Sequence, residues 1–156
     1  MCRSTRLPVV PSGVQSANCF IAGVLAHTGQ LDLSTQSVSQ RAIRRIRDLP
    51  NVPGHMHEWL DGRAQQAVAD HMDVGYVLVN PRQCIAMVFT ANRQQHENLP
   101  YAVLAWTQPN HVDPVATHGG RRCGLLHYEA MRRLLARRQI AVLFAREGEL
   151  LYIESD

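Results

Sequence analysis

The sequence contains no lysine, and all 16 of its basic residues are arginine, which against 13 acidic residues gives a formal net charge of +3. Such a chain offers no lysine side chain for the attachment of ubiquitin. Two explanations fit this absence. One is the codon usage of a GC-rich genome, and the other is a protein that works inside a eukaryotic cell. The sequence leaves both open.

Long apolar runs are also missing. The 156 residues are 46% hydrophobic and 6% aromatic, which is ordinary for a soluble globular domain, and no run approaches the roughly 18 apolar residues of a membrane-spanning helix. Basic residues occur before position 8, but Pro8, Pro11 and Gly13 interrupt the segment where the hydrophobic region of a secretory signal would follow. We therefore expect no membrane span, and a location in the cytoplasm or secretion without a Sec signal peptide.

Paired metal-binding motifs are absent as well. The four cysteines lie far apart, at Cys2, Cys19, Cys84 and Cys123. Without a CxxC pair they indicate neither a zinc ribbon nor a dense disulfide framework, so we expect reduced thiols. His55, His57 and His71 are candidate zinc ligands, but no HExxH motif accompanies them. We expect no metal site and no cofactor.

The apolar pattern predicts one domain over 14–156, preceded by an irregular arm over 1–13 in which Val9 and Val10 add a short edge contact. Helices are predicted near 16–28, 34–49, 61–72 and 124–138, and strands near 75–79, 84–90, 101–106, 139–144 and 150–153. In the second helix Arg41, Arg44, Arg45 and Arg47 are predicted mostly to face solvent. Helices followed by mostly antiparallel strands predict an α+β fold.

Cys19 is the first candidate functional residue. Ser16 or Asn18 is a suitable N-cap, the following residues form one apolar helical face, and Gly29 is suited to the left-handed C-cap. A thiol at the start of a helix lies near unpaired backbone N–H groups and the positive end of the helix dipole, and both favour the nucleophilic thiolate. The alternative is an inert, buried cysteine that packs as a small hydrophobic side chain.

A thiol nucleophile needs a base, and that base needs an orienting group. His96 and Asp113 are the best pair, because they flank the predicted strand over 101–106. Gln15, in the loop before Cys19, is placed to donate to an oxyanion. The rival bases are His111, His118 and His27.

The order Gln15, Cys19, His96 and Asp113, together with a cysteine helix that closes on glycine, resembles the C39-like branch of the papain-like cysteine peptidases. The resemblance runs from about Val14 to the end of the chain. It implies a papain-like α+β fold and a cysteine hydrolase, either a peptidase or a glutamine deamidase, that acts on a peptide or protein. In that family pattern Cys19 attacks, His96 moves the proton, Asp113 orients His96 and Gln15 stabilises the oxyanion.

Two other functions remain open. The segment 121–126 resembles the pyrophosphate loop of GNAT acetyltransferases, where backbone N–H groups at a helix start hold phosphate. The second possible function is that of a non-catalytic protein-binding adaptor. The arginines of the last predicted helix, Arg132, Arg133, Arg137 and Arg138, are diluted by Glu129, and we do not expect nucleic-acid binding. The sequence gives no indication of the oligomeric state.

Overall fold

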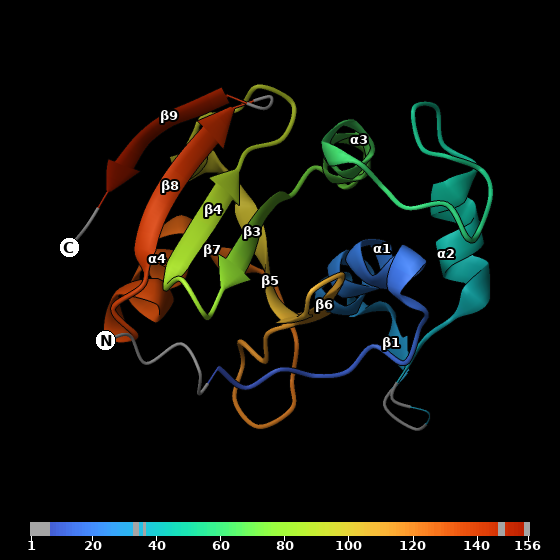
Figure 1. Ribbon diagram of the computed structural model, residues 1–156, viewed down its shortest axis with the longest axis horizontal. Coiled ribbons are helices and arrows are strands. Elements are labelled where there is room, and N and C mark those ends of the chain that lie inside the picture. Colours follow the sequence, from blue (N-terminus) through green and yellow to red (C-terminus); the bar gives the residue numbers. More distant parts are fainter. Residues whose placement is uncertain (1–6, 33–34, 36, 147–148, 155–156) are drawn as a thin grey trace.

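The computed structural model describes residues 7–32, 35, 37–146 and 149–154 (Figure 1). The helices are α1 (Cys19–Leu25), α2 (Gln40–Arg47), α3 (Gly62–Met72) and α4 (Tyr128–Arg137), with short helical turns η2 (Ser16–Asn18), η3 (Ala26–Gln30) and η4 (His96–Asn98). The strands are β1 (Leu31–Asp32), β2 (Ser37–Val38), β3 (Gly75–Asn80), β4 (Ile85–Phe89), β5 (Pro100–Gln108), β6 (His111–Pro114), β7 (Leu126–His127), β8 (Ala141–Arg146) and β9 (Glu149–Glu154).

The main sheet has the strand order β6-β5-β3-β4-β8-β9, and β7 pairs with the start of β5. Strands β3 and β5 run parallel, as do β4 and β8, while the other pairs are antiparallel. Parallel neighbours need a crossover rather than a tight turn. The long loop before β5 and helix α4 before β8 provide it. The predicted α+β class is confirmed, but the sheet is mixed.

Helices α1, α2 and α3 lie together on one side of the sheet, to the right of β3 in Figure 1, and α4 lies behind the sheet. Every residue of α1 is buried, and α1 lies against β5 and β6. Gly23 permits this close approach, because a Cβ atom there would lie 2.6 Å from Leu104 Cδ2. Phe20 of α1 meets Tyr76 of β3 edge to face, with 5.0 Å between ring centroids. These contacts fix the helix that carries Cys19 against the sheet.

Helix start signals act locally. Ser39 caps α2 by accepting a hydrogen bond from Ala42 N–H, and Asp61 caps α3 by accepting one from Ala64 N–H. Gly29 has φ 91°, the left-handed conformation expected for it. No helix within the described ranges is both long and apolar enough to cross a membrane.

The chain before α1 runs along the outer edge of β6. Val9 forms an antiparallel bridge with Val115, and Val10 N–H donates to Pro114 O at 2.8 Å. The predicted edge contact is therefore confirmed for Val9 and Val10, whereas residues 1–6 of the arm lie outside the described part of the chain. The arm covers hydrogen-bonding groups that a bare edge strand would expose.

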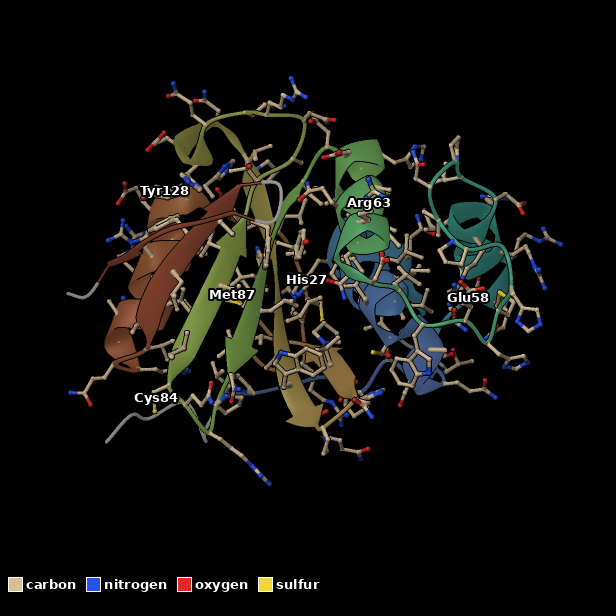
Figure 2. All side chains as sticks on the ribbon, turned by 45° about the horizontal axis from the view of Figure 1, so that its top comes forward. His27, Glu58, Arg63, Cys84, Met87 and Tyr128 are labelled. Carbon is tan, nitrogen blue, oxygen red and sulfur yellow. The ribbon has the colours of Figure 1, made fainter. Side chains whose placement is uncertain are left out.

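His27 follows α1 and is buried between the sheet and the helices (Figure 2). Its Nε2 donates to Val103 O at 2.8 Å, and its Nδ1 accepts from Gly124 N–H at 3.0 Å. Those two bonds fit one neutral tautomer, which ties α1 to β5 and to the loop before β7. Burial lowers the pKa of His27 below 6.5. His27 is therefore a structural link and not a base for Cys19.

Candidate active site

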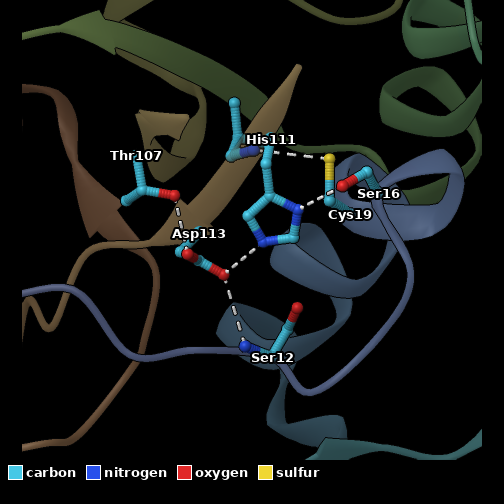
Figure 3. A network of polar contacts seen from close by, with 7 residues as sticks. Ser12, Ser16, Cys19, Thr107, His111 and Asp113 are labelled. Atoms are coloured by element: carbon cyan, nitrogen blue, oxygen red, sulfur yellow. Dashed lines mark hydrogen bonds and ion pairs between the residues drawn. The ribbon is translucent and has the colours of Figure 1, made fainter. Parts of the chain in front are cut away.

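Strand β6 carries a histidine–aspartate pair. His111 and Asp113 are two residues apart, so the period of a strand directs both side chains to one face. His111 Nε2 lies 3.0 Å from Asp113 Oδ1 (Figure 3). Since an ionised carboxylate only accepts hydrogen bonds, we assign the proton of neutral His111 to Nε2. The lone pair on Nδ1 then points away from Asp113 and can accept a hydrogen bond or a proton.

Asp113 is held by two further donors and is 6% exposed. Thr107 Oγ1, near the end of β5, donates to Oδ2 at 2.9 Å, and Ser12 N–H of the N-terminal arm donates to Oδ1 at 3.4 Å. A carboxylate with its oxygens occupied in this way cannot rotate freely. The arrangement fixes the direction in which the His111 ring points.

Ser16 and Cys19 lie on the Nδ1 side of that ring (Figure 3). Ser16 Oγ is 3.0 Å from His111 Nδ1, so with the assigned tautomer the hydroxyl donates. Cys19 Sγ accepts a hydrogen bond of 3.4 Å from the backbone N–H of Val112, the residue between the histidine and the aspartate. Two possible nucleophiles therefore lie beside one oriented base.

The Cys19 thiol is 6% exposed, and burial raises its pKa above 9.0. The negative charge of Asp113 also raises it, while backbone N–H groups, led by that of Val112, lower it. The expectation of a thiolate favoured by the helix start is therefore wrong, because desolvation outweighs the backbone contribution. Cys19 is a neutral thiol that needs a base.

His96 lies in η4, before the start of β5, and Tyr101 Oη donates to its carbonyl. Its ring packs 4.5 Å from that of Phe144 on β8. Asp113 pairs with Ala105, and five strand steps of about 3.3 Å place Ala105 roughly 17 Å from Pro100. The structure thus brings Asp113 to Cys19, but it does not bring His96 there. The long rigid strand β5 separates the two.

Of the other predicted residues, Gln15 is exposed and directly precedes η2, one residue before Ser16. His118 lies elsewhere, with its Nδ1 2.9 Å from Thr117 Oγ1. His111, a rival base in the sequence prediction, is the histidine that reaches the cysteine helix. The sequence analysis predicted no strand at 111–114, where the structure has β6. The His-x-Asp spacing becomes a signal only within a strand, where it directs both side chains to one face.

Sequence reasoning missed a buried arginine under the site. Arg47 is 1% exposed, which contradicts the prediction that it faces solvent. Its guanidinium donates to Asn18 Oδ1 at 2.7 and 3.1 Å, to Ala17 O at 3.0 Å and to Pro53 O at 3.1 Å. Asn18 Nδ2 in turn donates to Met56 O at 3.0 Å. This network holds the two residues that immediately precede Cys19.

A small cavity of about 90 Å³ opens beside Cys19. Its wall is mostly apolar, and Trp59, which is 52% exposed, stands at one side. The lining residues are Ser16, Ala17, Cys19, Phe20, Trp59, Leu60, Gln65, Leu78, Trp106, Asn110 and Val112. An apolar cavity that reaches both candidate nucleophiles is suited to part of a substrate.

No group of three potential metal ligands occurs among the residues that the structure describes. Of the described cysteines, Cys19 and Cys123 are free, whereas Cys84 is disulfide-bonded, so the expectation of reduced thiols is wrong for Cys84. The sequence matches no protein-family model and no curated protein.

Proposed function

We propose that the protein is a cysteine-dependent hydrolase of papain-like type that acts on a peptide or protein. The observation that carries this proposal is the oriented pair His111–Asp113, with Nδ1 facing the start of the cysteine helix. A base held by a carboxylate beside a thiol is the arrangement that nucleophilic catalysis requires. His111 takes the role that the sequence prediction gave to His96.

In the proposed reaction His111 Nδ1 removes the Cys19 proton as Sγ attacks the carbonyl carbon of an amide. The imidazolium, stabilised by Asp113, then donates that proton to the departing amine, which leaves a thioester. Water attacks the thioester with His111 again as base, and the thiol and a carboxylic acid are released. If the amide belongs to a glutamine side chain, the departing amine is ammonia and the result is deamidation.

The tetrahedral intermediate carries a negative oxygen that needs donors. The side-chain amide of the exposed Gln15 is one proposed donor. The backbone N–H of Cys19 donates to Ser16 O, so it acts as the second donor only after it gives up that bond. Because burial raises the pKa of Cys19, His111 removes the thiol proton as Sγ attacks in the proposed reaction. Ser16 must give up its hydrogen bond to Nδ1 when His111 acts.

A second candidate is a serine hydrolase with Ser16 as nucleophile. The specific observation in its favour is the 3.0 Å contact between Ser16 Oγ and His111 Nδ1, while Cys19 Sγ is bonded to a backbone N–H. Both candidates use the same base and the same carboxylate. Paired variants at Ser16 and Cys19 separate them.

The experiment incubates the protein with a digest of denatured protein and follows new termini and amide-to-acid conversion by mass spectrometry. We expect Cys19→Ala and His111→Ala to abolish turnover, and His96→Ala, the matched control, to retain it. Thermal unfolding of each variant shows that it folds. Turnover that survives Cys19→Ala but not Ser16→Ala would establish the serine mechanism, and no turnover by the unmodified chain would favour an adaptor.

A further inference from the structure

Trp106 is a shared wall of the small cavity at Cys19 and of a larger groove of about 710 Å³. The groove is lined by the turn after β3 and by the end of β5, from residues Asn80, Pro81, Arg82, Trp106, Thr107, Gln108 and Pro109. Thr107 also donates to Asp113. The groove thus adjoins the candidate active site, with Trp106 as the shared wall and Thr107 in contact with Asp113.

The two hollows differ in chemistry. The cavity at Cys19 has a volume of about 90 Å³, which is smaller than an apolar cavity of roughly 150 Å³ that binds a benzene ring, and carbon atoms dominate its wall. A short branched aliphatic side chain fits such a space, whereas an aromatic ring does not. A site of this kind discriminates strongly, because one methylene group changes specificity by roughly 10- to 200-fold.

The groove offers amide and hydroxyl groups and one cation. Arg82 is exposed and forms no ion pair with any described residue, and none of the described residues that line the groove is acidic. A single arginine beside polar groups matches one carboxylate, since guanidinium binds carboxylate through two parallel hydrogen bonds. Nucleic acid would require several phosphate-binding cations along the groove.

We propose that the substrate is an extended peptide segment with a small aliphatic residue in the cavity at Cys19 and an acidic residue that binds Arg82 across Trp106. This inference rests on the proposed function and adds the substrate class to it. Strand turns and edges present backbone groups to an extended peptide, and alternate side chains give the specificity. The indole of Trp106 provides the apolar surface between the two contacts.

The first test uses a peptide library in which one position varies among alanine, valine and phenylalanine and a second, a few residues away, varies among aspartate, glutamine and arginine. We expect kcat/KM for valine peptides to exceed that for phenylalanine peptides at least tenfold, because the cavity excludes the ring. Leu78→Ala enlarges the cavity and should reverse part of this preference. Met87→Ala, at the cross-strand neighbour of Leu78 that does not line the cavity, is the control.

The second test reverses the charge in the groove. Arg82→Glu should lower kcat/KM for aspartate peptides roughly 5- to 20-fold and raise it for arginine peptides, and 0.5 M salt should weaken both effects. Arg133→Glu, an exposed arginine on α4, changes the net charge equally and should leave the preference unchanged. If Arg82→Glu and the unmodified protein show the same preference for aspartate over arginine peptides, the inference about the groove is overturned, whereas the proposed hydrolase activity is not.

Binding separates the two proposals if the unmodified chain turns over no peptide. The same peptides are then titrated into the Cys19→Ala variant by fluorescence anisotropy. Tighter binding of valine–aspartate peptides, lost in the double variant with Arg82→Glu, supports the substrate groove on a protein that is not a hydrolase. Equal binding of all peptides overturns the groove.

Discussion

Replacement of Arg47 by methionine tests whether the buried network under α1 stabilises the fold and the site. Methionine has a similar apolar stem but no donor. The substitution leaves three acceptors without the guanidinium, namely Asn18 Oδ1, Ala17 O and Pro53 O. Each buried acceptor that loses its partner costs about 1–3 kcal/mol.

At the low end of that range the three acceptors together cost about 3 kcal/mol. A loss of 1 kcal/mol lowers the melting temperature by about 2–4 °C in a chain of this size. We therefore expect the Arg47→Met variant to melt about 6–12 °C lower. The melting temperature of Arg47→Lys should lie between those of Arg47→Met and the unmodified protein, because one ammonium group cannot reproduce the planar set of donors of a guanidinium.

The assays are thermal unfolding, which gives the melting temperature, and equilibrium unfolding in urea, which gives the free energy of unfolding, both followed by the fluorescence of the two tryptophans. Arg44→Met is the matched control, because Arg44 lies on the same helix and is exposed, and its substitution should change stability by less than about 0.5 kcal/mol. Equal unfolding midpoints for the two variants would refute the argument. The network also holds the residues before Cys19. Full turnover by Arg47→Met, with an unchanged rate of Cys19 alkylation, would therefore also refute the argument.

Three further predictions concern the site and its pH dependence. At pH 7 iodoacetamide should alkylate Cys19 of the folded protein more slowly than Cys19 of the urea-unfolded chain, and more slowly than the half-buried Cys123. The alkylation rate of Cys19 should rise with pH. Pulse labelling and mass spectrometry measure these rates. Because burial lowers the pKa of His27, the unfolded chain binds a proton below pH 6.5 that the folded chain does not, so stability should fall as the pH drops, by up to about 1.4 kcal/mol per pH unit. His27→Gln should remove this slope in urea titrations at pH 5 to 7, whereas the exposed His71→Gln should keep it. Gln15→Ala should lower kcat roughly 100-fold with little change in substrate affinity or melting temperature, and an unchanged kcat would exclude Gln15 as an oxyanion donor.

The local elements followed from the sequence because their causes are local. The helix at Cys19 with its closing Gly29, the helices capped in the second and third segments, and the strands after position 74 all show the apolar spacing of their type. The candidate nucleophile Cys19 lay in such a segment, whereas His111 and Asp113 lie in β6, a strand that the sequence analysis did not predict. The α+β class followed from the order of the predicted helices and strands along the chain.

Strand pairing decided which histidine meets the cysteine. Both His96 and His111 flank β5, and nothing local distinguishes them as bases. The hairpin between β5 and β6 places His111 beside Asp113 and against α1, whereas η4 places His96 at the far end of β5, against Phe144. Contacts between residues about 95 positions apart, such as Ser16 with His111, depend on the packing of α1 against the sheet edge.

Burial was likewise a tertiary outcome. The helical pattern grouped Arg47 with the solvent-facing arginines. In the structure it is buried, and its acceptors come from Pro53 and from η2, the turn before α1. Burial also removes water from Cys19, so desolvation exceeds the effect of the helix start on its pKa. A side chain's neighbours in sequence determine its conformation, but its solvation depends on distant segments that pack against it, and solvation decides the charge state of a nucleophile.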